Sequence, residues 1–259
     1  MKRTFWKIRE ALLRFLGMEQ MQTRLAELKR DLESIETLQQ TSAASKTGQL
    51  RLVYEWKAML RRGEPLPSFG EVEFRAFSQN SEDGILLYLF SLIGTANKTC
   101  VEICAGDGIE CNSTNLILNH GWTGLLVDGN EQLVKKGRAF YARHRDTFSF
   151  PPKFAHAWVE RETINDLIRQ HGIEGEIDLL SLDMDGVDYW IWEAIEVIQP
   201  RVVVAETQCI WGAERSVSVP YRRDFHSPLI QGFGVYSGAS LPAFVRLAKR
   251  KGYRLVGQG

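Results

Sequence analysis

Acidic residues and glycines gather where two predicted strands end. The apolar run 98–103 leads into Gly106 and Asp107, and the run 123–127 leads into Asp128 and Gly129. Glycines let a backbone turn tightly and approach a ligand closely, and an acid after the second strand is placed to accept hydrogen bonds from ribose hydroxyls. We therefore expect a ribose-containing ligand at this edge, although either feature alone also fits an ordinary strand-to-helix turn.

Two classes of cofactor share these features, and the charge of the loop distinguishes them. A dinucleotide needs a GxGxxG turn that holds its pyrophosphate at a helix N-terminus, and residues 102–110 do not spell that motif. Glu102, Asp107 and Glu110 would repel a pyrophosphate, whereas S-adenosylmethionine (SAM) carries a sulfonium and an ammonium and no phosphate. The sequence thus favours SAM over NAD as the cofactor.

A second group of acids follows the apolar run 177–182. Asp183, Asp185 and Asp188 come directly after it, and Glu206 ends the next apolar run. Because an unpaired buried carboxylate is costly, we expect a substrate hydroxyl, the cofactor's amine or a divalent ion such as Mg²⁺ or Mn²⁺ to compensate these charges. Asp183 and Asp185 are predicted to act as the general base or, with Glu206, as metal ligands. Asp188 is predicted to cap the following helix.

Two histidines and one long segment complete the predicted acceptor site. His156, at the end of the third predicted strand, is the third catalytic candidate, and His226 is a secondary one, although a lone histidine is more often structural. The segment 208–240 has no clean periodicity, and a loop this long is usually functional. Its aromatic and arginine side chains suit a sugar ring and an anionic group of a glycoconjugate, or they belong to a lid over the cofactor.

Short apolar runs alternate with helical stretches across residues 98–208. The runs are apolar or β-branched throughout, as buried parallel strands are, and Gly121 and Gly172 are placed to end helices. The alternation predicts an α/β protein with a Rossmann-like, doubly wound and mostly parallel sheet, whose strand ends bring the acids to one edge. The predicted strands are 98–106, 123–129, 153–159, 177–186, 200–208 and a sixth at 253–257, and the predicted helices are 113–120, 130–144, 162–171, 187–198 and 240–251.

The N-terminal residues follow a different pattern. Apolar residues from Met18 to Ile35 recur at alternating spacings of three and four, which predicts an amphipathic helix that forms a coiled coil between two copies or packs on its own domain. Residues 1–17 carry five basic residues and one acid, a composition compatible with an anionic membrane surface and with a solvated helix face. The predicted domains are a helical segment at 1–45, a linker and connecting helix at 46–70, and a catalytic domain at 71–259.

Composition excludes several classes of protein. With 44% hydrophobic residues the chain can bury a core, and with 32 basic against 32 acidic residues it has no overall field to attract nucleic acid. The four cysteines form neither a CxxC pair nor a secreted disulfide frame, and no apolar run is long enough to span a membrane. We expect a cytoplasmic protein, peripheral to the inner face of a membrane if residues 1–17 bind one.

Several short motifs occur together between residues 70 and 257, and their combination resembles the FkbM-like group of SAM-dependent methyltransferases. The resemblance implies a class I methyltransferase fold and methyl transfer from SAM to a hydroxyl. It places Gln79, Glu102, Gly106, Asn112, Ser113 and Asp128 around the cofactor, and Asp107 and Gly129 join them as loop neighbours. The motifs are residues 78–84, 101–108, 112–114, 121–124 with Asp128, and 178–190.

Two features depart from the pattern of that group. Cys104 stands where such loops usually have their first glycine, so its backbone must tolerate a side chain. The class usually ends with a hairpin of two strands, and this sequence ends after the first predicted one. We expect a longer natural chain, a strand from a partner, or an open sheet edge that invites association.

Two functions from different classes follow from the sequence. The first is an O-methyltransferase acting on a hydroxyl of a sugar, a glycan or a related secondary metabolite. The second is a catalytically silent methyltransferase-like module whose coiled coil recruits partners as a scaffold. The acid cluster after residue 182 argues against silence, because a dead site has no reason to keep costly charges together.

Overall fold

The computed structural model describes residues 46–227, 229–230, 233–234 and 236–258, with Met21, Thr23–Leu25 and Glu27. The predicted basic segment 1–17 lies outside the described residues, and so does most of the predicted heptad seam. Residues Leu50–Gly259 form one compact unit, and Met1–Gln49 form another. Among the helices described, none combines the length and the apolar character needed to cross a membrane.

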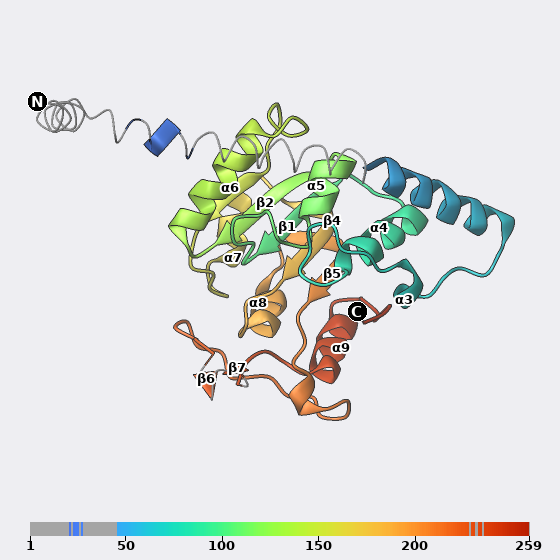
Figure 1. The fold of residues 1–259 in the computed structure, drawn as a ribbon. Helices are drawn as coiled ribbons and strands as arrows, with labels where there is room; N and C mark the ends of the chain where they lie inside the picture. The colour runs from blue at the N-terminus through green and yellow to red at the C-terminus, as the bar shows by residue number, and fades with distance from the viewer. Residues whose placement is uncertain are drawn as a thin grey trace, which may run out of the picture. The chain divides into compact units, whose positions relative to one another are not determined.

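Five parallel strands form the central sheet (Figure 1). They lie in the order β3-β2-β1-β4-β5, and each neighbouring pair is parallel. The predicted α/β class and the five predicted parallel strands are confirmed, and the arrangement is compatible with the Rossmann-like fold. The chain leaves β1 toward one edge of the sheet and returns at β4 toward the other, which makes the β1–β4 boundary a topological switch point. The strands are β1 (Thr99–Ile103), β2 (Thr123–Asp128), β3 (Lys153–His156), β4 (Gly175–Leu182) and β5 (Ile198–Ala205).

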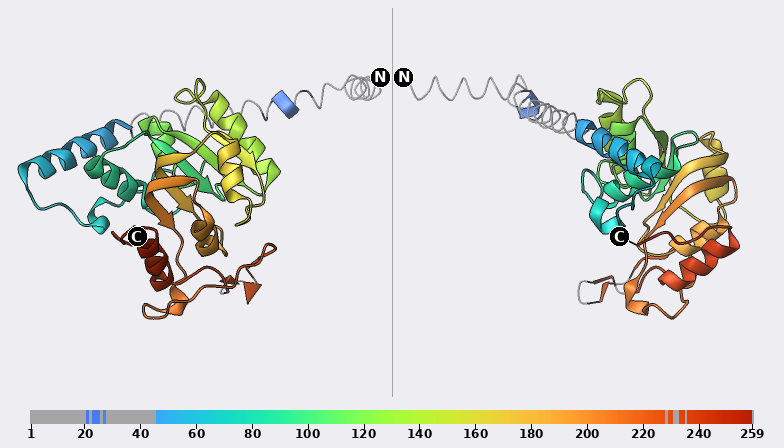
Figure 2. Two further views of the ribbon diagram at one scale, coloured as in Figure 1. Left: turned by 180° about the vertical axis from the view of Figure 1, so that it is seen from behind. Right: turned by 90° about the vertical axis from the view of Figure 1, so that its right-hand side faces the viewer.

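Helices cover both faces of the sheet (Figures 1 and 2). The five helices predicted between residues 113 and 251 are present, and Gly121 and Gly172, both left-handed at φ 68° and 70°, end two of them as expected. The helix predicted at 187–198 stops early, because β5 begins at Ile198. The helices are one over residues 46–62, α3 (Phe69–Val72), α4 (Glu82–Ile93), α5 (Thr114–His120), α6 (Glu131–Arg143), α7 (Ile164–Gln170), α8 (Asp188–Ala194) and α9 (Leu241–Arg250).

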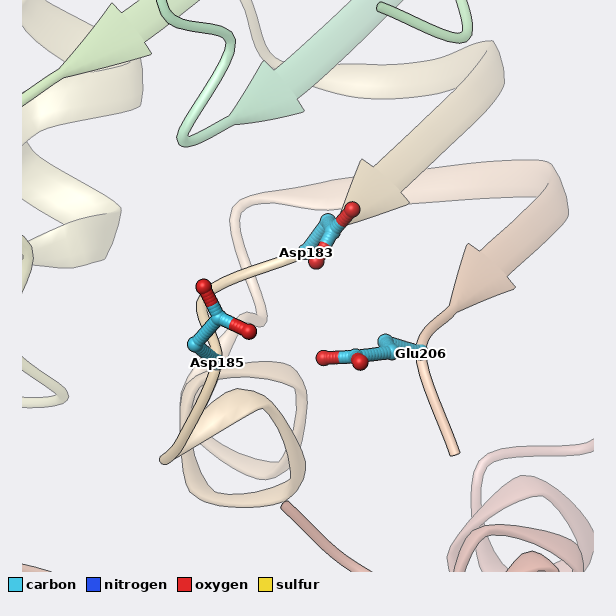
Figure 3. Close-up of side chains that lie close together, drawn as sticks. All are labelled: Asp183, Asp185 and Glu206. Carbon is cyan, nitrogen blue, oxygen red and sulfur yellow. The ribbon is translucent and has the colours of Figure 1, made fainter. Parts of the chain in front are cut away.

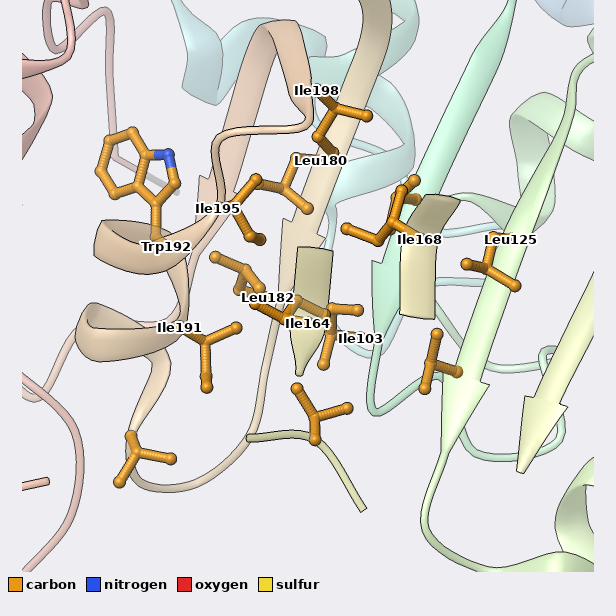
Figure 4. Close-up of a cluster of buried hydrophobic side chains, with 14 of the residues drawn as sticks. Ile103, Leu125, Ile164, Ile168, Leu180, Leu182, Ile191, Trp192, Ile195 and Ile198 are labelled. Atoms are coloured by element: carbon orange, nitrogen blue, oxygen red, sulfur yellow. The ribbon is translucent and has the colours of Figure 1, made fainter. Parts of the chain in front are cut away.

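Alternate strand residues point to opposite faces, and each face has its own apolar core. On one face Leu125 and Leu180 pack with residues of α7, α8 and α9 (Figure 4). On the other face Leu126 and Leu179 pack with residues of α4, α5 and α6. Burial on both faces explains why these strands are continuous apolar runs in the sequence.

The predicted sixth strand is wrong. Residues 253–258 form no strand, because the Tyr253 N–H donates to the Ala248 carbonyl at 2.8 Å and the Tyr253 hydroxyl donates to the Pro200 carbonyl at 2.6 Å. These bonds fold the chain back on the end of α9. Within the described residues β5 therefore pairs only with β4 and forms an edge of the sheet.

The segment 208–240 contains more structure than its sequence pattern indicates. It holds a 3₁₀ turn at Cys209–Trp211 and a hairpin of β6 (Leu229–Ile230) and β7 (Phe233–Gly234). A backbone bond from Gly238 to the Gly186 carbonyl at 3.0 Å ties it to the turn that follows β4. The segment thus begins and ends at the carboxyl ends of the strands, where the acids lie.

Candidate functional site

Three carboxylates converge where β4 and β5 end (Figure 3). Asp183 directly follows β4, Asp185 lies two residues further on, and Glu206 directly follows β5. The parallel register pairs Leu182 with Ala205, which sets Asp183 beside Glu206. Oxygens from the three side chains all lie within 4.8 Å of one another, so the structure brings the predicted acid group together.

The three residues are exposed, so the expectation that these carboxylates are buried is wrong. The pKa values of Asp183 and Glu206 are nevertheless shifted toward neutral pH. Desolvation first, and then repulsion by Asp188 and Asp185, raise the pKa of Asp183 to about 6. Desolvation and repulsion by Asp183 likewise raise the pKa of Glu206 to about 7. A carboxylate with a pKa in this range can accept a proton at neutral pH. Carboxylate oxygens gathered from three side chains also suit Mg²⁺ or Mn²⁺.

Asp188 has a different role from the one predicted. It is fully buried at 0% exposure, and its oxygens accept the N–H groups of Met184 at 2.7 Å and Gly186 at 3.2 Å. Val187 occupies the N-cap position of α8, so the expectation that Asp188 caps the helix is wrong. Its carboxylate instead braces the turn that holds Asp185, which adopts a left-handed φ of 52°.

The loop after β1 is tightly turned and open. Cys104, Gly106 and Gly108 all have positive φ, at 62°, 59° and 67°. No atom lies within 4 Å of the position that a side-chain carbon would take on Gly106, so a ligand could approach the backbone there.

Both desolvation and nearby negative charges act on the Cys104 thiol. Desolvation and the carboxylates of Asp128, Asp188, Asp183 and Asp185 raise the pKa of its thiol to about 12. The negative charges at the ends of β2 and β4 therefore converge on the loop after β1. Such a potential favours a cationic ligand and disfavours a pyrophosphate.

Two acids that the sequence argument used against pyrophosphate are paired. Asp107 accepts a bond of 2.6 Å from the Lys136 ammonium, and Glu110 lies 3.4 Å from the Arg75 guanidinium. Their charges are largely compensated. The acids at the ends of β2 and β4 remain to repel a pyrophosphate.

Three predicted cofactor residues connect elements to one another. Glu102 accepts the backbone N–H groups of Asn112 at 2.9 Å and Ser113 at 2.8 Å, and the Asn112 amide donates to the Ser181 hydroxyl at 3.0 Å. Ser113 is fully buried at 0% exposure. These side chains hold the start of α5 against β1 and β4, so they shape the loop that a ligand would meet.

Asp128 joins the loops that follow β1 and β2. Its two oxygens accept the N–H of Gly106 at 2.8 Å and the N–H of Asn130 at 2.7 Å. Each carboxylate oxygen has a second lone pair, which a ligand hydroxyl could use. Gln79, by contrast, is exposed in the loop before α4, and no hydrogen bond joins it to another described residue.

His156 does not lie with the acid group. It ends β3, which β2 and β1 separate from β4, and three strand spacings of about 4.8 Å put it roughly 14 Å from Asp183. A ring nitrogen of His156 lies 3.1 Å from the Gly129 carbonyl. The structure therefore places His156 beside the predicted ribose site.

Trp158 is a candidate that sequence reasoning missed, because it was counted within the third strand. β3 ends at His156, and the Trp158 side chain turns out beside Gly129, 3.3 Å from where a side-chain carbon of that glycine would lie. Its indole N–H donates to the Arg223 carbonyl at 2.7 Å, and its ring lies 5.3 Å from that of His226. With 54% of its surface exposed, it offers a fixed aromatic face next to Asp128.

The segment 208–240 is attached to the site at two further points. The Tyr221 hydroxyl accepts the Arg161 N–H at 3.0 Å and donates to Glu162 at 2.9 Å, which ties it to the β3–α7 connection. Phe225 packs so closely on Gly186 that a side-chain carbon there would lie 2.5 Å from its ring. The expectation that this segment lies over the site thus has contacts to support it.

Trp190 and Trp192 pack within the fold. Trp190 donates its indole N–H to the Val219 carbonyl at 2.7 Å, and Trp192 stacks on Phe244 at 6.1 Å.

The candidate site thus consists of the open acid-lined loop after β1, the three carboxylates after β4 and β5, and an aromatic face after β3. No protein-family model matches the chain, and no curated protein matches it.

Proposed function

We propose that this protein is a SAM-dependent O-methyltransferase of the FkbM-like kind, acting on a hydroxyl of a sugar, a glycan or a related secondary metabolite. One geometric observation carries the proposal: Asp128, which accepts the Gly106 N–H, and the acid group after β4 and β5 lie at the strand ends next to the open loop after β1, and their charges give it a negative potential. SAM carries a sulfonium and an ammonium, so this potential favours it. The same potential works against a pyrophosphate-containing cofactor.

The residues around this loop fit the proposed cofactor. Asp128 would accept hydrogen bonds from the ribose hydroxyls, and the open backbone at Gly106 would allow close approach. Glu102 would act indirectly, through the loop that it holds. When bound, SAM supplies an activated methyl group for displacement by an oxygen nucleophile.

The acid group would prepare the acceptor hydroxyl. Asp183, with a pKa of about 6, is mostly ionised at neutral pH and can take the hydroxyl proton. Asp185 and Glu206 complete a set of oxygen donors that Mg²⁺ or Mn²⁺ prefers, and such an ion would lower the pKa of a bound hydroxyl. In either case these side chains orient the acceptor, which is the larger part of catalysis in a displacement reaction.

The aromatic face at β3 supports a sugar or glycan acceptor less directly. Trp158 is held rigid by its bond to Arg223, and His226 lies beside it. Flat side chains of this kind can stack on the apolar face of a sugar ring. The same face could instead stack on the adenine of the cofactor.

Calorimetric titration tests the cofactor class. The full chain is titrated with S-adenosylhomocysteine, with NADH as a control, in the presence and absence of Mg²⁺ or Mn²⁺. We expect saturable binding of S-adenosylhomocysteine and none of NADH. A folded protein that binds neither ligand would favour the scaffold function, and binding of NADH alone would overturn the proposed cofactor.

Two matched substitutions separate cofactor binding from catalysis. Asp128→Ala removes the ribose acceptor, and we expect it to weaken binding of S-adenosylhomocysteine by about tenfold or more. Asp183→Asn keeps the size of the side chain, and we expect it to leave that binding within about threefold while abolishing methyl transfer. Lost cofactor binding in folded Asp183→Asn would instead assign Asp183 to the cofactor site.

A further inference from the structure

The loop between α6 and β3 presents two phenylalanines to solvent. Phe148 is 63% exposed and Phe150 is 84% exposed, although most large apolar side chains of the compact unit pack in its cores. Two exposed aromatic rings separated by one residue are costly to keep in water, and such patches usually mark an interaction surface.

Hydrogen bonds fix the backbone that carries these two rings. The Phe148 N–H donates to the His144 carbonyl at 2.9 Å, and the Phe150 N–H donates to the Thr147 carbonyl at 2.9 Å. The Thr147 hydroxyl donates to the Tyr141 carbonyl at 2.7 Å, and both Thr147 and His144 are buried. The exposure of the rings is therefore built into closed turns anchored on α6.

The surroundings of the rings are basic. Arg143 and Arg145 are exposed just before them, and neither forms an ion pair with a described acid. Residues 143–153 contain three basic residues against one acid, Asp146. The patch thus combines apolar rings with uncompensated guanidinium groups.

We propose that this loop binds the surface of an anionic lipid bilayer, with Phe148 and Phe150 inserted at the interface and Arg143 and Arg145 on the headgroups. Aromatic rings beside basic side chains are the combination that membrane interfaces favour. Two rings and two guanidinium groups are small against the roughly 800 Å² that each partner buries in a stable protein interface. At an anionic membrane surface each guanidinium contributes about 1 kcal/mol, which adds to the apolar area that the rings bury.

The position of the loop is compatible with the proposed function. It precedes the amino end of β3, whereas Asp183 and Glu206 follow the carboxyl ends of β4 and β5 (Figure 1). Because the strands are parallel, the loop lies at the amino ends of the strands and the acids lie at their carboxyl ends. A bilayer bound through this loop would leave the candidate site open to water.

Flotation with vesicles tests the proposal on the full chain, so that any contribution of residues 1–17 is the same in every arm. With vesicles of equimolar phosphatidylcholine and phosphatidylserine, we expect Phe148→Ser/Phe150→Ser to lower the partition coefficient by at least about tenfold. The matched control is Leu255→Ser/Val256→Ser, because those side chains are also exposed, at 52% and 59%. Equal binding by the loop variant and the unmodified chain would overturn the proposal.

Charge and depth are tested separately. Arg143→Glu/Arg145→Glu should abolish the preference for phosphatidylserine over pure phosphatidylcholine that the loop provides. In Phe150→Trp, brominated lipid should quench more fluorescence than in the unmodified chain, because the new indole would lie in the bilayer. Unchanged quenching in a variant that still floats would overturn insertion. A serine variant that floats as well as the unmodified chain but self-associates less would assign the patch to a protein partner.

Discussion

The acid group after β4 and β5 should make the stability of the protein depend on pH. Asp183 and Glu206 titrate at about 6 and about 7, well above the value of about 4 expected in an unfolded chain. An acid whose pKa is raised by folding lowers stability as pH rises through this range, since the folded state must then lose protons against desolvation and repulsion. We expect the melting temperature to fall between mildly acidic and mildly alkaline pH, and Mg²⁺ to restore part of it only at the alkaline end.

Asp183→Asn should remove that behaviour. At mildly alkaline pH without metal we expect it to raise the free energy of unfolding by about 1 kcal/mol, a figure reduced for solvent screening, and to abolish the Mg²⁺ response. Glu214→Gln, which removes the same charge from an exposed position, serves as the control and should change neither quantity. Thermal scans at both pH values measure this, and a Mg²⁺ response that persists in Asp183→Asn would rule out the acid group as the metal site.

Cys104 adopts a backbone conformation that most side chains disfavour. Its φ of 62° lies in the region that favours glycine, which agrees with its place in a loop where glycine is usual. We expect Cys104→Val to cost about 1 to 3 kcal/mol, because a β-branched side chain tolerates this region worst. Cys104→Gly should stay within about 1 kcal/mol of the unmodified protein, since relief of strain and added freedom of the unfolded chain oppose each other. Urea denaturation compares them, and equal stability of the two variants would contradict the strain.

At the scale of elements, one buried carboxylate connects β1, β4 and β5 near the amino end of β1, away from the candidate site. Asp178 on β4 is fully buried and accepts the N–H groups of Ala96, Asn97 and Lys98 just before β1, at 2.7 to 3.0 Å. It also accepts a bond of 2.9 Å from Arg201 on β5. Burial opposes ionisation, but these donors outweigh it and lower the pKa of Asp178.

Asp178→Ala should therefore be strongly destabilising. We expect a loss of about 3 kcal/mol, because the substitution leaves three backbone N–H groups and a guanidinium without the buried carboxylate that accepts from them. Since the pKa is lowered on folding, the contribution is present above about pH 4 and disappears as the pH falls below that. Urea unfolding at neutral and acidic pH measures this, with exposed Glu176→Ala on the same strand as the control. A loss that is equal at both pH values would show that the charge is not its cause.

The contact between Gly186 and Phe225 tests whether the segment 208–240 is held over the site. A methyl group on Gly186 would lie 2.5 Å from the Phe225 ring, so Gly186→Ala should displace the segment and increase its cleavage in limited proteolysis severalfold. Adding Phe225→Ala makes room for the methyl group. If the double variant were cleaved much faster than Phe225→Ala alone, the contact would not explain the effect.

The elements that the sequence predicted well are those whose physics is local or repeated. β1, β2, β4 and β5 are apolar on both faces, so they were recognisable without knowing their neighbours. The pairing order and the fate of residues 253–258 depend on distant groups, such as the Pro200 carbonyl that Tyr253 bonds. For the same reason sequence reasoning found Asp183, Asp185 and Glu206 but could not foresee that Glu102 would be occupied by backbone N–H groups or that His156 would lie three strands away.

For the whole molecule, the two cores predict where the fold is most and least protected. β1 lies between β2 and β4, and Cys100, Val101 and Ile103 are at 0% exposure, whereas β5 is an edge strand whose outer residues are partly exposed. In hydrogen exchange followed by mass spectrometry, we expect the amides of β1 and β4 to exchange slowest, those of β5 to exchange faster, and those of the segment 208–240 fastest of these.

Mg²⁺ should change this pattern at one end of the sheet only. An ion held by Asp183, Asp185 and Glu206 would slow exchange in the turns after β4 and β5. Because Phe225 and Gly238 contact Gly186, the protection should extend into the segment 208–240 and leave the α6–β3 loop unchanged. The same experiment with Asp183→Asn is the control, since it should show no slowing. Protection that appeared at the α6–β3 loop but not after β4 would mean that the ion binds elsewhere, and the acids would then serve as a general base without a metal.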